Sequence, residues 1–296
     1  MNTVTNITRH YNAPTGAARS IGDILVATGR LSIDDAGRVL ARQRQDNSQF
    51  GDAAIALKLL TKEDIDFALS KQFDYAYLTG QDTSLSPELV AAYKPFSRVG
   101  ENLRAVRSQL MLRWFNGDPL HKVLAIVSPD SHEGRSFVSA NLAIVFAQDG
   151  QRTLLLDGDL RATTARGQNA LFKLGKSAGL SGILAGRAGL EAALQVHGLP
   201  GLTVLPAGAV PPNPQELLGR STFGQLLLTA SKQFDVIIID TSASSFYADS
   251  EIIASRAGAA LLVARKNQSL MLKTAVLARR LQDSGVTLVG SVLNDA

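Results

Sequence analysis

The chain has 296 residues, 45% of them hydrophobic, and a formal net charge of +4. This length suits one large domain with a proper core plus a smaller one. No apolar run approaches the roughly 20 residues of a membrane-spanning helix, and the absence of cysteine excludes disulfides and thiolate metal sites. The lack of cysteine agrees with a reducing cytoplasm, and we expect a globular cytoplasmic protein. Basic residues are dispersed rather than gathered into a groove, so we expect no nucleic-acid binding.

Residues 1–18 are polar and rich in small residues, and we expect a disordered tail there. A repeat with a period of 29 residues follows, in which Ile21-Gly22-Asp23 recurs as Phe50-Gly51-Asp52. Later in each copy, Ser32 or Thr61 precedes an acidic pair and an apolar periodicity, which is the pattern of a capped helix. The repeat therefore predicts a short helix, a turn and a longer capped helix, used twice.

The repeat region, residues 19–78, resembles the N-terminal domain of the type II secretion and pilus assembly ATPases. Tandem repeats of that domain bind cyclic di-GMP in some members, and there each repeat starts with Arg-Leu-Gly. Here the matching positions are Ser20-Ile21-Gly22 and Gln49-Phe50-Gly51, so the arginine that would hold a guanine or a phosphate is absent from both. We favour a protein-docking module, with cyclic di-GMP binding as the alternative.

Residues 79–97 contain glycine and proline and start with a Ser/Thr-rich stretch, which predicts a linker with a short helix from 86 to 93. An amphipathic helix begins next. It carries Glu101, Arg104 and Arg107 on neighbouring turns of one side, opposite an apolar stripe. Taken alone, such a charged side is a solvated face.

The apolar run 123–127 and the residues after it predict a strand, a phosphate-binding loop and the start of a helix. A P-loop, Gly-x4-Gly-Lys-Ser/Thr, uses backbone N–H groups around phosphates, a lysine on the terminal phosphates and a hydroxyl on Mg2+. Gly134 and Ser136 match this pattern, whereas Arg135 stands at the lysine position and Pro129 at the first glycine. The predicted phosphate-binding residues are Ser131, His132, Glu133, Gly134, Arg135, Ser136 and Phe137.

Two further apolar runs, 153–157 and 234–240, end in carboxylates, as expected for buried parallel strands whose C-terminal ends carry a site. Asp157, Asp159 and Asp240 should therefore meet the loop at one sheet edge. Mg2+ in proteins is commonly bound by a small number of carboxylates together with waters and nucleotide phosphates, so these residues suit a Mg2+ site. The alternative is that these carboxylates only cap turns. The pattern predicts an α/β fold with a doubly wound, mostly parallel sheet.

Together these motifs resemble the bacterial tyrosine kinases of exopolysaccharide synthesis, which share the fold of the deviant P-loop ATPases that includes the partitioning ATPases. The resemblance covers residues 98–296 and is strongest for the subgroup on a separate chain, associated with polysaccharide chain-length determination. The matching motifs are Glu101-x2-Arg104-x2-Arg107 for oligomerisation, 154–161 for the second Walker motif, 237–241 for Walker B, and 205–208 with 212–218 for a further family signature.

The resemblance implies ATP and Mg2+ as cofactors and assigns roles to site residues. Arg135 would neutralise the terminal phosphates, while Ser136 and Asp240 would hold the metal. Asp157 and Asp159 are the candidates for accepting the tyrosine proton and for a second metal contact, and the sequence does not distinguish between them. The predicted catalytic residues are thus Asp157, Asp159 and Arg135, and the predicted metal ligands are Ser136, Asp159 and Asp240.

The resemblance also implies partners: a tyrosine-containing protein substrate, a membrane polysaccharide chain-length determinant, and further copies of the chain bound through Glu101, Arg104 and Arg107. The implied location is peripheral, at the inner face of the plasma membrane through that partner. None of the five tyrosines lies near the final residues, so the tyrosine-rich tail common in the family is not expected.

Two departures from the family pattern keep other functions open: Arg135 replaces a lysine, and His132 stands where glycine is common. The chain could be a partitioning-type ATPase without phosphotyrosine formation, or a nucleotide-binding pseudokinase scaffold that docks a membrane polysaccharide complex. The sequence argues against a Ser/His/Asp hydrolase, because the four histidines are scattered and no Gly-x-Ser-x-Gly elbow is present.

Overall fold

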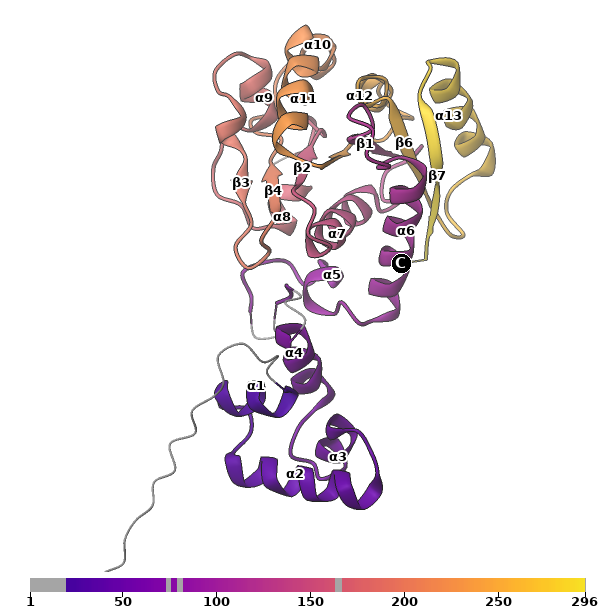
Figure 1. The fold of residues 1–296 in the computed structure, drawn as a ribbon. Helices are drawn as coiled ribbons and strands as arrows, with labels where there is room; N and C mark the ends of the chain where they lie inside the picture. The colour runs from indigo at the N-terminus through magenta and orange to yellow at the C-terminus, as the bar shows by residue number, and fades with distance from the viewer. Residues whose placement is uncertain (1–19, 73–75, 79–81, 163–166, 296) are drawn as a thin grey trace, which may run out of the picture. The chain divides into compact units, whose positions relative to one another are not determined.

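The computed structural model describes residues 20–72, 76–78, 82–162 and 167–295. The predicted tail, residues 1–18, lies outside the described residues. The chain divides into two compact units, Met1–Tyr75 and Ala76–Ala296 (Figure 1). Each has an apolar core of its own, and each is described by itself.

The smaller unit is helical, with α1 (Ile21–Ala27), α2 (Ile33–Asp46), α3 (Phe50–Ala56) and α4 (Lys62–Gln72). The predicted pattern of a short and a longer helix, used twice, is therefore confirmed. The hydroxyls of Ser32 and Thr61 accept the backbone N–H groups of Asp35 and Asp64, at 3.0 and 3.2 Å, as N-caps do. The repeated glycine has a packing reason, because a Cβ at Gly51 would lie 3.2 Å from the Ile65 side chain.

The larger unit is built on a sheet (Figure 1). The seven strands of this sheet in the described residues have the order β3-β4-β2-β5-β1-β6-β7. All neighbours are parallel except β3 and β4. This confirms the predicted α/β, mostly parallel fold. The strands are β1 (Val123–Val127), β2 (Thr153–Asp157), β3 (Leu194–Gln195), β4 (Leu202–Leu205), β5 (Val236–Asp240), β6 (Ala259–Arg265) and β7 (Thr287–Asn294).

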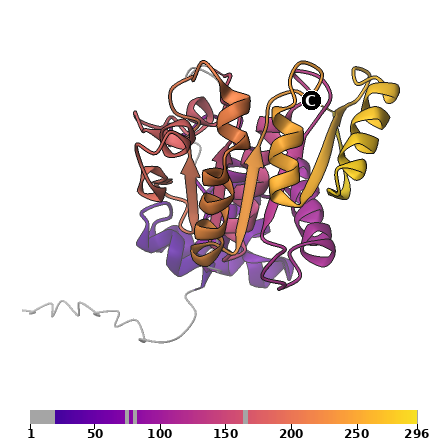
Figure 2. The same ribbon diagram turned by 90° about the horizontal axis from the view of Figure 1, so that it is seen from above.

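Helices cover both faces of this sheet, as the view from above shows (Figure 2). Alternate strand residues enter different cores: Ile126 and Ile238 pack on the side of α6 and α7, whereas Ala125 and Ile239 pack on the side of α11 and α12. Burial on both faces explains why β1, β2 and β5 are continuous apolar runs. The helices are α5 (Val90–Tyr93), α6 (Arg98–Arg113), α7 (Arg135–Gln148), α8 (Gln168–Leu171), α9 (Gly179–Leu184), η1 (Leu190–Ala192), α10 (Pro214–Gly219), α11 (Ser221–Gln233), α12 (Asp249–Ala257) and α13 (Met271–Asp283).

The segment 79–97 differs from the predicted linker in its described part, residues 82–97. Leu85 and Leu89 are buried in the core on the α7 side. The Ala91 N–H donates to Asn141 Oδ1 at 2.9 Å, and Gln148 Nε2 donates to the Ala91 carbonyl at 2.9 Å. Its glycine and proline content suggested a linker, but its leucines fill the space beside α7.

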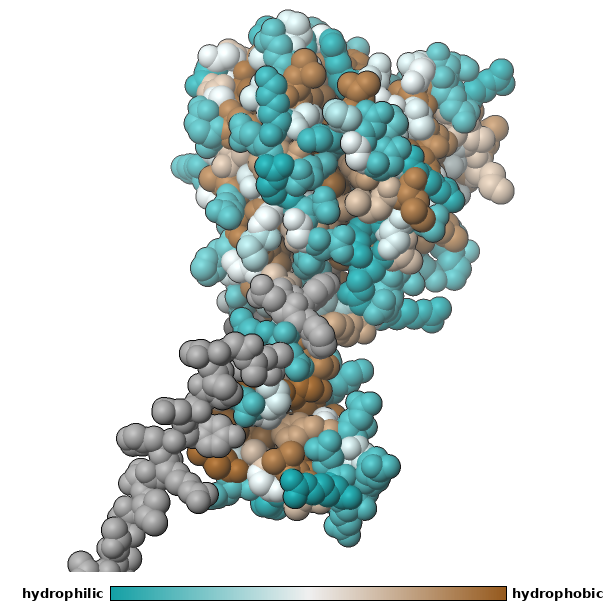
Figure 3. All heavy atoms as spheres, in the orientation of Figure 1, coloured by the Kyte–Doolittle hydropathy of each residue, from teal (hydrophilic) through white to brown (hydrophobic). Residues whose placement is uncertain are grey.

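The surface of the larger unit mixes polar and apolar side chains on the face seen in Figure 3. No helix among the described residues combines the length and the apolar composition needed to cross a bilayer.

Candidate functional site

The site lies where β1, β5 and β2 end at one edge of the sheet. β5 lies between the other two strands, and Asp157 and Asp240 are register partners at the ends of β2 and β5. The loop after β1 carries the P-loop-like residues and leads into α7. The order along the edge is therefore phosphate-binding loop, Asp240, Asp157, as the three sequence patterns predicted.

The loop has the shape of an anion-binding nest. His132 and Gly134 have positive φ values of 62° and 97°. The His132 carbonyl accepts a hydrogen bond from Arg265 at 3.1 Å, and the Glu133 carbonyl accepts one from Asn294 Nδ2 at 3.2 Å. Because carbonyl and N–H of a trans peptide point in opposite directions, the N–H groups of Glu133 and Gly134 point away from Arg265 and Asn294. Alternating backbone conformations of this kind form concave sites for phosphate.

Glu133 and Arg135 hold the loop from within. The buried Glu133 carboxylate accepts the Asp130 N–H at 2.7 Å and the Ser269 hydroxyl. Arg135 Nε donates to the Thr241 carbonyl at 2.9 Å, and its Nη1 donates to the Asp130 carbonyl at 2.6 Å and to the Ser128 hydroxyl. The guanidinium therefore ties the end of β1 to the end of β5 and keeps a positive charge beside the nest.

The two strand-end carboxylates are buried and close to each other. Asp157 is only 2% exposed, and burial together with the charges of Asp240 and Asp159 raises its pKa well above the usual range. Burial also raises the pKa of Asp240, although the hydroxyl of Ser136, the amide of Gln168 and the charge of Arg135 act in the opposite direction. Asp159 is half-buried, and its backbone N–H donates to Asp157 at 3.2 Å.

The residues present fit a hard cation such as Mg2+. Asp240 Oδ1 and Gln168 Oε1 are buried and have no hydrogen-bond partner among the described residues, and the Ser136 hydroxyl lies beside Asp240. Within the described ranges no cluster of three or more His, Asp or Glu side chains could hold a metal alone. A cation here would need water and phosphate ligands as well, which is how proteins commonly bind Mg2+.

Gln168 is a site residue that sequence reasoning missed. Its backbone N–H donates to Asp157 Oδ2 at 3.1 Å, and its side-chain Nε2 donates to Asp240 Oδ2 at 2.8 Å and to the Ser136 carbonyl at 3.2 Å. It thus contacts all three parts of the site. No motif or spacing in the sequence singles out this glutamine, because its contacts depend on how the chain returns to the sheet edge.

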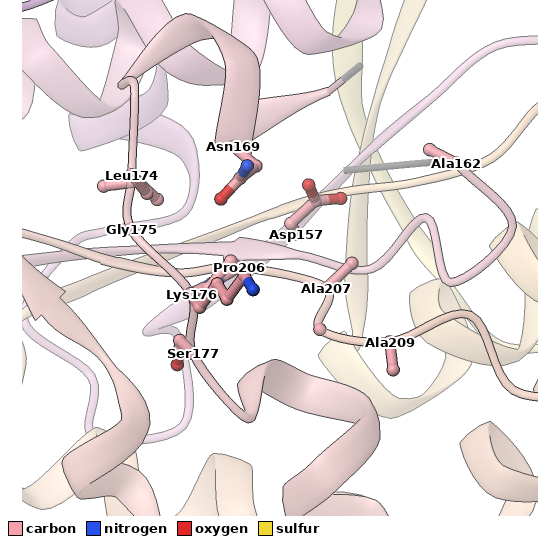
Figure 4. Close-up of a pocket in the computed structure, with 11 residues that line it drawn as sticks. Asp157, Ala162, Asn169, Leu174, Gly175, Lys176, Ser177, Pro206, Ala207 and Ala209 are labelled. Atoms are coloured by element: carbon pink, nitrogen blue, oxygen red, sulfur yellow. The ribbon is translucent and has the colours of Figure 1, made fainter. Parts of the chain in front are cut away.

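A cavity of about 380 Å³ lies beside Asp157 (Figure 4). Its lining includes the residues after β4, which is the neighbour of β2 on the side away from β5 and β1. Its walls come from the end of β2 and the loop after it, from α8, from the residues before α9, and from the residues after β4. They are Asp157, Ala162, Asn169, Leu174, Gly175, Lys176, Ser177, Pro206, Ala207, Gly208 and Ala209. The segment 205–208, noted in the sequence as a family signature, thus lines part of this cavity.

Comparison with known proteins places this site in a family, although no family model matches the chain. The chain is 34% identical over 214 residues to CapB of Staphylococcus aureus, which is named as a tyrosine-protein kinase. The match covers 72% of this chain and 90% of CapB. The chain therefore belongs to the bacterial tyrosine-protein kinases. Etk of Escherichia coli K12, another tyrosine-protein kinase, is 35% identical over 206 residues, which are 69% of this chain but only 28% of Etk.

The solved kinase domain of the Escherichia coli tyrosine kinase Etk aligns with a TM-score of 0.66 and 32% identity, covering 76% of this chain and 86% of that one. The resemblance predicted from the motifs is therefore confirmed, and so is the P-loop tyrosine-kinase fold. The roles of individual residues within this family member remain predictions.

Proposed function

We propose that the chain is an ATP-dependent protein tyrosine kinase that acts in the synthesis, chain length or export of an exopolysaccharide. One observation carries the proposal: the phosphate nest, Asp240, Asp157 and the cavity follow one another along a single sheet edge. This order would place the nucleotide phosphates and an acceptor side chain on opposite sides of Asp157. Relatives named as tyrosine-protein kinases support the same activity.

In the proposed reaction, the N–H groups of residues 131–137 hold the ATP phosphates at the start of α7. Bound Mg2+ would neutralise charge on the transferring phosphoryl group, and Ser136, Asp240 and Asp159 are the residues that would hold it. The acceptor tyrosine oxygen bonds to the γ-phosphorus while the bond from that phosphorus to ADP breaks. Asp157 accepts the tyrosine proton, because burial makes it a stronger base than an exposed carboxylate.

The contacts of Arg135 favour one alternative function, that of a nucleotide-binding pseudokinase scaffold. Its guanidinium bonds to carbonyls of the loop and of Thr241, so it supports the loop and need not reach the terminal phosphates. A partitioning-type ATPase would use the same nest and metal ligands without an acceptor tyrosine.

For partners we propose a membrane polysaccharide chain-length determinant, a tyrosine-containing protein substrate and further copies of the chain bound through the α6 side that carries Glu101, Arg104 and Arg107. The chain would then work at the inner face of the plasma membrane through its partner. For the smaller unit we propose protein docking rather than cyclic di-GMP binding.

The test is to incubate the purified chain with Mg-ATP, with and without a candidate membrane partner, and to detect phosphotyrosine with an antibody and by mass spectrometry. The Asp157→Ala and Asp240→Ala variants should lose the signal. Asp235→Ala is the matched control, because Asp235 lies just before the opposite end of β5 and pairs with Arg152. Nucleotide binding without phosphotyrosine in any mixture would establish the scaffold instead.

A further inference from the structure

The cavity beside Asp157 has a wall held by direct backbone contact between two segments. Gly179 and Gly208 have positive φ values of 59° and 84°, and a Cβ at Gly208 would lie 2.2 Å from the Ala178 carbonyl oxygen. The Leu180 N–H donates to the Pro206 carbonyl at 2.8 Å. The start of α9 is thereby fixed against the residues after β4, so this part of the wall exists before any ligand arrives.

The size and chemistry of the cavity suit one aromatic side chain with a polar tip. Its volume, about 380 Å³, is near the lower end of the roughly 300–1,000 Å³ typical of ligand pockets. Leu174, Pro206 and Ala207 supply apolar surface, while Asp157 and Asn169 supply polar groups that Figure 4 shows near each other. A tyrosine has this combination of an apolar ring and a polar hydroxyl.

Among the described residues that line the cavity, Lys176 is the one with a cationic side chain. It is exposed, and it forms no ion pair within the described parts of the chain. In Figure 4 its side chain points in among the other residues that line the cavity. The nearby Lys173 differs, since its ammonium donates to the Thr83 carbonyl at 2.5 Å. Lys176 therefore offers a positive charge to whatever enters.

We propose that this cavity receives the acceptor tyrosine and that Lys176 selects acceptors with Asp or Glu two residues from it. The proposal rests on the proposed kinase function and names the substrate class for the same site. In an extended peptide, side chains two residues apart point to the same face, so a carboxylate there can reach Lys176 while the ring occupies the cavity. An exposed charge pair of this kind changes affinity by up to about 5-fold.

The experiment uses the full chain with Mg-ATP and three alanine-rich peptides that carry one tyrosine, with Glu, Gln or Lys two residues away on each side. We expect kcat/KM for the Glu peptide to exceed that for the Gln peptide about 5-fold, through KM. Lys176→Met should abolish the preference, Lys176→Arg should retain it, and Lys176→Glu should turn it toward the Lys peptide. Lys232→Met, an exposed lysine in the last turn of α11, is the control and should behave as the parent.

A second measurement separates this proposal from the kinase activity itself: fluorescence anisotropy with labelled Glu and Gln peptides in which Phe replaces Tyr, in the presence of Mg-ADP. Phosphorylation of all three peptides with equal kcat/KM would overturn the role of Lys176 and leave the kinase function standing. If no peptide is phosphorylated, the kinase function fails. Equal binding of the labelled Glu and Gln peptides in the anisotropy measurement would overturn the role of Lys176. Weaker Mg-ADP binding by Lys176→Met would show that the lysine binds the nucleotide, and this result would also overturn its role in selecting acceptors.

Discussion

Arg135 is the residue at which this chain departs most clearly from an ordinary P-loop. A lysine ammonium is a mobile point charge, whereas this planar guanidinium is engaged by two carbonyls and a hydroxyl at the ends of β1 and β5. In the function proposed above, arginine at this position would give up part of a phosphate-binding role and support the loop instead. How far the exchange has gone decides between a slow kinase and a scaffold.

Arg135→Lys should release the charge toward the terminal phosphates, so we expect faster phosphotransfer or ATP hydrolysis together with a lower unfolding temperature of the nucleotide-free chain. Arg135→Ala removes the charge as well as the loop bonds and should weaken ATP binding about 10-fold or more. Steady-state kinetics, calorimetric titration and scanning calorimetry measure the three effects. A lysine variant slower than the parent would mean that the loop is adapted to arginine.

Gln168 contacts both buried carboxylates, so its amide should matter for the metal and not only for folding. Gln168→Met keeps the length and removes the donor to Asp240, and we expect the Mg2+ concentration needed for half-maximal ADP binding to rise about 5- to 10-fold. Gln148→Met is the matched control. The amide of Gln148 also donates to backbone carbonyls, but these are the carbonyls of Ala76 and of Ala91 in α5. If both variants change Mg2+ dependence equally, Gln168 has only a structural role.

The raised pKa of Asp240 predicts a pH dependence of stability. Because the folded-state pKa lies above the model value of 3.8, the native state binds more protons than the unfolded state between the two pKa values. Stability of the nucleotide-free chain should therefore fall as pH rises through that window, and the full cost should persist above it. Asp240→Asn removes this cost.

We expect Asp240→Asn to unfold about 2–4 °C above the parent at pH 8 without ligand, with the difference shrinking toward pH 4, as scanning calorimetry can measure. The same variant should lose the Mg2+-dependent part of its affinity for ADP. A variant that is less stable than the parent at every pH would show that hydrogen bonds to the carboxylate outweigh its burial cost.

Among the elements, α6 carries charged residues with two different roles. Glu101 is exposed (65%) and pairs with Arg104 on its own helix at 2.5 Å, whereas Arg107 is largely buried (16%). Arg107 donates to the Val145 carbonyl at 3.1 Å and pairs with Asp149 at 3.0 Å, so it joins α6 to α7 within the chain. The three residues matched one motif in the sequence but are not equivalent in the structure.

Glu101→Ala should therefore reduce self-association without changing the unfolding temperature, because its side chain faces solvent. Arg107→Ala should lower the unfolding temperature, since it removes contacts between two helices. Sedimentation of each variant at low and high salt and thermal unfolding of each variant test these two roles. Self-association through charge pairs should weaken as salt rises. If Glu101→Ala sediments like the parent at both salt concentrations, this side of α6 is exposed to solvent and takes no part in self-association.

The sequence was sufficient for elements whose pattern is local. Continuous apolar runs identified β1, β2 and β5, and the 29-residue period identified the helices of the smaller unit. It was insufficient where distant contacts decide. The leucines at 85 and 89 bury a segment whose composition resembles a linker, and Arg265 and Asn294 reach the phosphate-binding loop from the ends of β6 and β7. Such contacts leave no signal in a single sequence.

At the scale of the whole molecule, the chain joins two units with separate cores. Leu25, Val39 and Ala54 belong to the helical unit, and none of the residues in its core appears in the two cores of the sheet unit. Units with separate cores commonly fold independently. The nest, the carboxylates and the cavity all lie within Ala76–Ala296.

We therefore expect a fragment of residues 76–296 to bind Mg-ADP with the affinity of the full chain, and the full chain to unfold in two calorimetric transitions of which the fragment retains one. Cyclic di-GMP should give no heat with either protein, because both repeats lack the arginine of the binding members. Calorimetric titration and scanning calorimetry measure both effects. Loss of ADP binding in a folded fragment would mean that the helical unit contributes to the nucleotide site. Cyclic di-GMP binding by the full chain but not by the fragment would make that unit a nucleotide sensor that uses other residues.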